Sequence, residues 1–461
     1  MTTRTFSQSR PRWAVVAAVA AALAMGSFAV SGLVRPPQPV PPAADIPALN
    51  LPDGPAAAAA GTRPIEAIDR AIGVWTGNLE RDSADFIAAT NLTQLYLARG
   101  RLTGAGDDYQ RALSAADAAQ AILPTSVGVR ALHAQVQLSL HDFAGAASVA
   151  GDLLAEQPDL PQALAILGDA SLELGEYPVA SDAYARLQAR AASPAVTARL
   201  ARLTAVTGTI ADARALAENA AAAADADPDL LPVDRAWYQV LLGALAFQAG
   251  DVSAARDAYQ AALTAWPQGP AALAGLGRAQ AALGDRAAAI GSYEAAVRLL
   301  PQPDWLAALG DLDNLTGRPG DAEAAFAQVR AIAALDAAGA RLYSRGAIAF
   351  LANHGETPAA AVAQAAAELE RRHDIYAWDG YAWALYAAGR YDEAAEAASQ
   401  ARALGTQDAL LDYHAGMIAA ARGRIAEARI LLTAALDRNP FFDPLQATRA
   451  RGMLRQLGSS S

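Results

Sequence analysis

The sequence predicts an all-α protein, a solenoid built from many copies of a helix pair. Hydrophobic residues make up 53% of the 461 residues, and much of that share is alanine, the strongest helix former. The C-terminal part of the chain also resembles itself at a spacing of 34 residues. Gly355, Gly389 and Gly423 recur at that spacing. Units of this length cannot bury their apolar faces alone, so they stack on one another.

The chain begins with a segment typical of a membrane signal. Three arginines precede an uncharged apolar run, residues 13–34, and Arg35 ends that run. As a helix these 22 residues would reach about 33 Å, enough to cross a bilayer. Two interpretations of residues 1–35 stay open: a single transmembrane anchor, or a signal peptide whose apolar core ends at Gly26 and which is cleaved after small residues.

Both interpretations place the rest of the chain outside the cytoplasm, because the positive residues should stay on the cytoplasmic side. The chain is then either a single-pass protein of the cell membrane with an extracytoplasmic C-terminal domain, or a secreted or periplasmic protein. Membrane contact is expected through the N-terminal segment only if that segment is not cleaved. The sequence has no cysteine, which excludes disulfides, thiol nucleophiles and cysteine-ligated metals.

Residues 36–62 are rich in proline and alanine, so we expect a semi-extended linker without secondary structure of its own. The formal net charge of the chain is −11. Residues 1–35 contain four arginines and no acidic residue, and removing them leaves −15. A domain this acidic is a poor binder of phosphate backbones, so nucleic acid is not an expected partner.

A capping helix is expected at each end of the solenoid, because the terminal units would otherwise expose an apolar face. In residues 63–85 the apolar side chains that recur at helical spacing are Ile68, Ala71, Ile72 and Trp75. In residues 441–461 a last helix can start near Asp443 and Pro444 and cover the final unit with Leu445, Met453 and Leu457.

Residues 86–440 are predicted to hold about ten helix-turn-helix units. Three units align without gaps from Arg341, Ile375 and Ala409, and they bring Ala360, Ala394 and Ala428 into register. A second pair, from Ala236 and Pro270, aligns Leu242-Gly243 with Leu276-Gly277, Gly250 with Gly284 and Tyr259 with Tyr293. Further units start near Phe86, Val127, Pro161, Pro194 and Pro303. Irregular spacing at 222–235 and 332–340 suggests breaks between sub-arrays.

This pattern resembles the tetratricopeptide repeat (TPR), whose helix pairs form a right-handed superhelix. The family has Leu-Gly near positions 7 and 8, an alanine at 20, an aromatic at 24 and a proline at 32. The resemblance implies that small residues at 8 and 20 allow close helix approach, and that positions 2, 5, 9, 12 and 13 of the first helix face a concave groove. The implied partner is a protein or peptide.

Eight side chains occupy such groove positions and are mostly aromatic. They are Tyr376, Asp379, Trp383 and Tyr386 in one unit, Tyr413 and Met417 in the next, and Trp237 and Phe247 in an earlier unit. Aromatic anchors in a concave surface are the usual energetic centre of a binding site. The alternative is that these bulky side chains only pack against the neighbouring unit.

The sequence favours a non-enzymatic scaffold or assembly factor of the cell envelope. None of its five histidines pairs with another at the spacing of a helical metal site, and no phosphate loop or nucleophile elbow is present. We therefore expect no catalytic residue, cofactor or metal. Two alternatives are a structural solenoid that self-associates through its edges or caps, and an α/α-toroid carbohydrate-active enzyme with paired carboxylates, whose repeats would be longer and less regular.

Overall fold

The computed structural model describes residues 64–335, 344–355 and 357–459, which form 22 helices and no strand. The helix α2 (Pro64–Arg81) is followed by ten consecutive helix pairs and by α23 (Gln446–Ser459). The first five pairs are α3 (Phe86–Thr103) with α4 (Gly106–Ile122), α5 (Val127–Ser139) with α6 (Phe143–Glu156), α7 (Pro161–Leu174) with α8 (Tyr177–Arg190), α9 (Pro194–Thr207) with α10 (Ile210–Asp225), and α11 (Pro232–Gln248) with α12 (Val252–Ala265).

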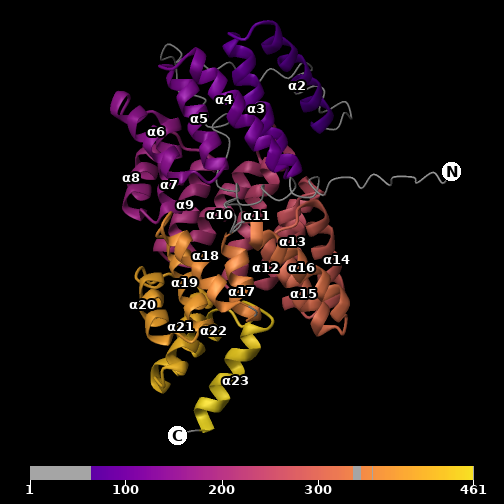
Figure 1. Ribbon diagram of the computed structural model, residues 1–461, viewed down its shortest axis with the longest axis vertical. Helices are drawn as coiled ribbons and strands as arrows, with labels where there is room; N and C mark the ends of the chain where they lie inside the picture. Colours follow the sequence, from indigo (N-terminus) through magenta and orange to yellow (C-terminus); the bar gives the residue numbers. More distant parts are fainter. Residues whose placement is uncertain (1–63, 336–343, 356, 460–461) are drawn as a thin grey trace, which may run out of the picture.

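The other five pairs are α13 (Pro270–Ala282) with α14 (Arg286–Leu299), α15 (Pro303–Leu315) with α16 (Pro319–Leu335), α17 (Ser344–His354) with α18 (Pro358–Leu369), α19 (Ile375–Ala387) with α20 (Tyr391–Ala401), and α21 (Ala409–Ala421) with α22 (Ile425–Arg438). The pairs stack in chain order (Figure 1). This arrangement confirms the predicted all-α solenoid.

The predicted anchor or signal and the linker lie in residues 1–63, outside the described residues. Among the helices that the structure describes, none combines the length and the apolar character needed to cross a membrane.

Local sequence signals explain where each helix pair turns. Glycines in the left-handed region end many of the first helices, for example Gly175 at φ 85°, Gly250 at φ 81° and Gly389 at φ 75°. An aspartate often starts the second helix. Asp251 is such a cap, since its side chain accepts a hydrogen bond from the Ala254 N–H at 3.1 Å.

In four of the pairs, the two helices meet where a glycine at position 8 of the first helix lies under a ring of the second. A Cβ added to Gly168 would lie 2.3 Å from the Tyr184 ring, and one added to Gly310 would lie 2.3 Å from the Phe326 ring. Both rings are buried. The small residue at position 8 thus makes room for the aromatic residue at position 24.

One predicted alignment is wrong by a residue. Ala394 and Ala428 are fully buried at equivalent positions, but in the preceding unit Ala361 is fully buried and Ala360 is exposed. The turn after Gly355 is one residue longer than the turns after Gly389 and Gly423, because α18 starts three residues after its glycine and α20 and α22 start two residues after theirs. The gapless alignment missed this insertion.

Stacking continues across both irregular stretches of the chain. At the first, Ala220 and Ala224 of α10 share a buried cluster with Tyr238 of α11. At the second, the rings of Phe326 in α16 and Phe350 in α17 lie 5.4 Å apart. The solenoid is therefore one continuous stack from α2 to α23.

The solenoid coils tightly enough for α17–α22 to lie against α7–α13 (Figure 1). Three successive loops between units meet three successive turns within units, about 200 residues earlier in the chain. His373 N–H donates to Leu174 O at 3.0 Å, Thr406 Oγ1 donates to Val206 O at 2.6 Å, and Asn439 Nδ2 donates to Phe247 O at 2.7 Å. We call this contact the seam. All three carbonyls are among the last four of their helix, which have no partner inside the helix, and Phe247 O also accepts from the Gly250 N–H at 2.9 Å.

The seam runs diagonally across the edge of the solenoid. The accepting carbonyl lies one residue before Gly175 at the first contact, two before Gly208 at the second and three before Gly250 at the third. A fourth contact lies further along, where Arg278 Nη2 donates to Phe442 O at 3.0 Å. The backbone packs closely at the seam, since a Cβ on Gly250 would lie 2.8 Å from Arg438 O.

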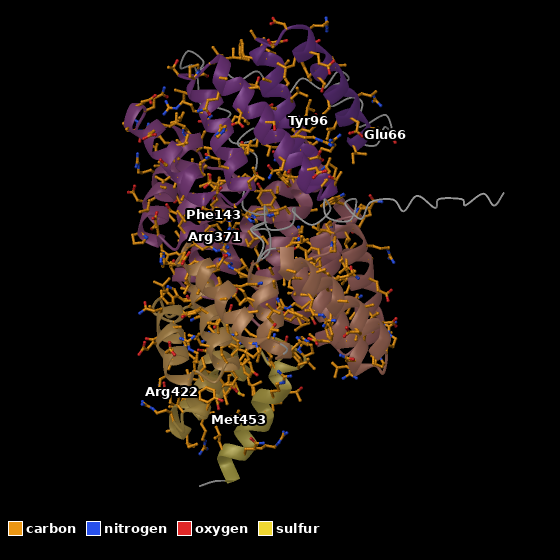
Figure 2. All side chains as sticks on the ribbon, viewed as in Figure 1. Glu66, Tyr96, Phe143, Arg371, Arg422 and Met453 are labelled. Atoms are coloured by element: carbon orange, nitrogen blue, oxygen red, sulfur yellow. The ribbon has the colours of Figure 1, made fainter. Side chains whose placement is uncertain are left out.

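A cluster of charged side chains fills the first seam contact. Glu173 of α7 pairs with Arg202 at 2.7 Å and with Arg372 at 3.4 Å. The Arg372 guanidinium also lies 5.9 Å from the ring of Phe143, which Figure 2 labels close to Arg371 at this junction. Burial opposes ionisation of Glu173, but the surrounding arginines outweigh it and lower the pKa of that carboxyl. The charges therefore hold distant units together.

Candidate partner-binding site

The predicted groove residues of α19 form part of a buried aromatic stack. Trp383 is only 4% exposed. Its ring is nearly parallel to that of Tyr386, with centroids 4.6 Å apart, and to that of His414, with centroids 4.1 Å apart. The indole Nε1 donates to Asn353 Oδ1 at 2.7 Å. Units α17, α19 and α21 thus meet at this one side chain.

Asp379 and His414 form a buried polar pair beside the stack. His414 Nδ1 lies 2.9 Å from Asp379 Oδ2, and both residues are buried. The carboxylate orients the imidazole against Trp383, so the pair supports the stack. No group of three or more His, Asp or Glu side chains that could hold a metal ion occurs among the residues that the structure describes.

Tyr413 and Met417 of α21 lie in the same buried cluster. Tyr413 is fully buried, its ring lies 5.3 Å from that of Phe442, and Met417 is 8% exposed. Burial raises the pKa of the Tyr413 hydroxyl. The helix α23 helps to cover this cluster, because Gln446 Nε2 donates to Asn353 Oδ1 at 2.8 Å and Ala447 and Ala450 are buried in it.

Of the two predicted groove residues in α11, Phe247 lies in the core and Trp237 lies at the surface. Phe247 is 1% exposed, and the Arg278 guanidinium lies 4.0 Å from its ring centroid. Trp237 is half-buried and meets the ring of Tyr238 edge-on at 5.1 Å. Phe247 also belongs to the seam, since its backbone carbonyl accepts from Asn439 Nδ2.

Three of the predicted residues remain partly accessible: Tyr376, Tyr386 and Trp237. Tyr376 lies under the Arg345 guanidinium, 5.5 Å from its ring centroid. Tyr386 stacks on Trp383 and also lies 5.7 Å from the ring of Tyr391, which is 40% exposed. The other five predicted residues are buried, so in this arrangement a partner can reach them only through their accessible neighbours.

Two other aromatic residues of α19, at positions 4 and 7 of its unit, are less buried than Trp383. Trp378 and Tyr381 pack against a buried cluster but stay half-buried, whereas Trp383 is buried. The seam, α21 and α23 cover the face that the sequence predicts to be open. Residues that sequence reasoning missed include Asn353 and Gln446, which carry no periodic signal because each acts through a contact with a distant unit.

Stacked helix pairs, four of which pack a glycine at position 8 under an aromatic ring, define the class of this protein as an α-solenoid of helical hairpins. A sequence model of the tetratricopeptide repeat family matches residues 132–196, 240–303 and 381–441. The matched segments lie in three separate parts of the stack, so each of these parts is similar to the tetratricopeptide repeat family. No curated protein matches the chain by sequence search.

Several solved structures resemble the chain at low sequence identity. A crystal structure of the APC/C hetero-tetramer Cut9-Hcn1 covers 85% of this chain and 93% of its own, at 17% identity and a TM-score of 0.32. PilW, described as a widely conserved type IV pilus biogenesis factor, covers 45% of this chain and 93% of its own, at 19% identity and a TM-score of 0.38. A human IFIT1 dimer with PPP-AAAA covers 81% of this chain and 85% of its own, at 13% identity and a TM-score of 0.45.

Proposed function

We propose that the protein is a non-enzymatic scaffold or assembly factor that binds another protein or peptide. The observation that carries the proposal is the tandem array of tetratricopeptide repeats with partly accessible aromatic side chains on a rigid base. Tyr386 is the best-supported anchor, because Trp383 and His414 beneath it are packed and hydrogen-bonded. A preordered aromatic side chain loses little conformational entropy when a partner covers it.

The partner chemistry follows from the accessible side chains. Tyr386 and Tyr391 offer a pair of rings in contact, and Tyr376 and Trp237 offer further partly exposed rings. Such surfaces suit apolar or aromatic side chains of a protein segment. The acidic net charge of −11 supports a protein rather than a nucleic acid as the partner.

The proposal includes a place in the cell envelope. The three arginines and the apolar run of residues 13–34 support insertion into or passage across a membrane. The proline-rich residues 36–62 would then hold the solenoid away from the bilayer. Labelling intact cells and opened cells with a membrane-impermeant reagent checks this, since labelling of the solenoid only in cells opened to the cytoplasm would contradict it.

The experiment that tests the function is capture of partners by the full chain from solubilised cell envelopes, followed by mass spectrometry. Tyr386→Ala removes the accessible ring and should reduce recovery of the specific partners at least tenfold, which corresponds to loss of an anchor of about 1.4 kcal/mol. Trp383→Ala is the less informative variant, because removal of a buried Trp costs about 3–5 kcal/mol of stability.

The matched control is Ile430→Ala, which removes an apolar side chain that is 69% exposed on α22. It should leave the recovered partners unchanged. Equal recovery with Tyr386→Ala and with the unchanged chain would remove Tyr386 from the binding site. If neither Tyr386→Ala nor Trp383→Ala lowers the recovery of any partner, the result would contradict the scaffold function itself.

A further inference from the structure

The seam shows that one edge of this solenoid recognises the other. In every helix pair the first helix runs from an inter-unit loop to an intra-unit turn, and the second helix runs back. All turns therefore lie along one edge, the turn edge, and all loops lie along the opposite edge, the loop edge. Within the chain, the loops that precede α19, α21 and α23 cover the turns that follow α7, α9 and α11.

The turn edge of the later units has no such cover from the described residues. A Cβ on Gly175 or Gly250 would lie within 2.8 Å of loop backbone, whereas one on Gly284, Gly317, Gly389 or Gly423 would meet no atom within 4 Å. Large apolar side chains are exposed beside these glycines. They are Leu283 (48%), Leu315 (40%), Tyr391 (40%) and Ile425 (40%).

The loop edge of the earlier units is the matching surface. The loops at 157–160, 191–193 and 226–231 stand at the start of α7, α9 and α11, the same place in the repeat as the loops that make the seam. Leu231 is 54% exposed there. Both free edges therefore carry exposed apolar residues where the internal contact buries its own.

The two free edges differ in charge. Arg318, Arg390 and Arg424 directly follow turn glycines, although Asp285 follows Gly284. The free loops carry Asp159, Asp227 and Asp229.

Neighbouring acids moderate this basic edge, since Arg318 pairs with Asp313 and lies 3.8 Å from both Glu294 and Asp321. Arg390 and Arg424 each touch a glutamate of their own helix, Glu393 and Glu427, yet the Arg424 side chain stays 61% exposed. The basic turns should attract the acidic free loops of a second copy.

We propose that the free turn edge of one copy docks on the free loop edge of a second copy. The contact repeats the packing of the internal seam, and the partner is another molecule of this chain. The two surfaces are different and lie on opposite edges, so the contact is head-to-tail and each added copy leaves one edge of each kind exposed. The turn edge includes Tyr391, which also contacts the ring of Tyr386, so the substitutions that test this contact are placed where they leave both tyrosines unchanged.

Light scattering and sedimentation of the full chain, in one mild detergent throughout, test the proposal. The mass per particle should rise with protein concentration to at least two chains and should fall with added salt. The turn-edge variant R424E/I425E should remain a single chain at the concentrations at which the unchanged protein associates. The loop-edge variant D229R/L231R should behave in the same way.

Mixing the two variants distinguishes a head-to-tail contact from a symmetric one. Each variant keeps the edge that the other lacks, so the mixture should recover a mass of at least two chains. I430E is the control, since it places a charge at the 69% exposed Ile430 away from both edges and should not change the mass.

Three results would overturn the proposal: a single chain at every concentration for the unchanged protein, association that neither edge variant weakens, or a mixture that stays as single chains. Circular dichroism of each variant checks that the helices are intact. All four substituted residues are at least partly exposed, so folding should not depend on them.

Discussion

The backbone conformation and the pKa of His141 are set by the tertiary structure around it. It has a positive φ of 60°, its Nε2 is buried, and its ring lies 5.5 Å from that of Phe143. Burial lowers the pKa of His141 to about 4, while Glu173 and Glu368 oppose this shift and Arg372 and Arg345 add to it. The imidazole is therefore neutral in the folded protein at neutral pH.

This predicts a pH dependence of stability. The pKa of His141 is lower in the folded chain than its usual 6.5, so between about pH 6.5 and pH 4 the unfolded chain binds a proton that the folded chain does not. The unfolding free energy then falls as the pH falls, by up to about 1.4 kcal/mol per pH unit from this residue. His141→Asn, which tolerates a positive φ, should flatten that slope in denaturant titrations at pH 7 and pH 5. Equal slopes for the two proteins would contradict the assignment.

The sequence predicted the chemistry of single residues better than their surroundings. Trp383 and Tyr413 are aromatic residues at a repeat position that faces inward, and the structure places them together. Their burial depends on two long-range contacts. Gln446 bonds Asn353, 93 positions earlier, and in the seam Asn439 bonds Phe247, 192 positions earlier. A 34-residue pattern describes only neighbours in the stack, so it could not show what covers that face.

At the scale of the helix pair, the glycine at position 8 allows the two helices to pack closely. A glycine inside a helix normally costs about 0.5–1 kcal/mol relative to alanine. At Gly168 the added methyl would lie 2.3 Å from the buried Tyr184 ring, so Gly168→Ala should destabilise the protein by about 1–3 kcal/mol. Gly291→Ala in α14 is the matched control, because its Cβ meets nothing within 4 Å.

The control should raise the unfolding free energy slightly, since only helix propensity changes. Denaturant unfolding monitored by circular dichroism measures both variants. A gain in stability for Gly168→Ala comparable to that of Gly291→Ala would mean that the ring moves aside freely.

Element positions were largely predictable because each helix carries its own start and stop signals. The ten pairs from α3 to α22 follow the repeats found by self-similarity. The exception is α18, where an extra turn residue moved Ala361 into the place expected for Ala360. The same shift puts Glu368 at the close-packed place that alanines fill at Ala401 and Ala435, and its carboxylate pairs with Arg372 at 2.5 Å.

At the scale of the whole molecule, the seam should tie distant units into one cooperative structure. Gly250 and Gly284 both have positive φ, 81° and 89°, so alanine at either site costs about 1–2 kcal/mol of backbone strain. Only Gly250 also lies against the seam, 2.8 Å from Arg438 O. Gly250→Ala should therefore cost about 1–3 kcal/mol more than Gly284→Ala.

Hydrogen exchange measures where that extra cost falls. Gly250→Ala should speed exchange at residues 438–442 and in α11, whereas Gly284→Ala should leave residues 438–442 unchanged. Faster exchange at 438–442 in both variants would mean that the seam does not transmit the change.

The coiling of the whole chain was not predictable from the sequence. The donors of the seam are ordinary loop residues, Thr406 and Asn439, and the acceptors are backbone carbonyls. Neither carries a signature that pairs it with a position about 200 residues away. The sequence gives the net charge and predicts the number of repeats. It does not predict the pitch of the superhelix, because that pitch depends on small rotations between units.

The diagonal seam also limits how the gene for such a protein can change. Open solenoids gain or lose repeats by duplication or deletion, because every repeat touches only its neighbours. Here an additional repeat inserted between α11 and α18 would advance His373, Thr406 and Asn439 past the carbonyls that they now meet. The number of repeats in that stretch is therefore a fixed count, and descendants of this chain should vary in residue identity there but not in copy number.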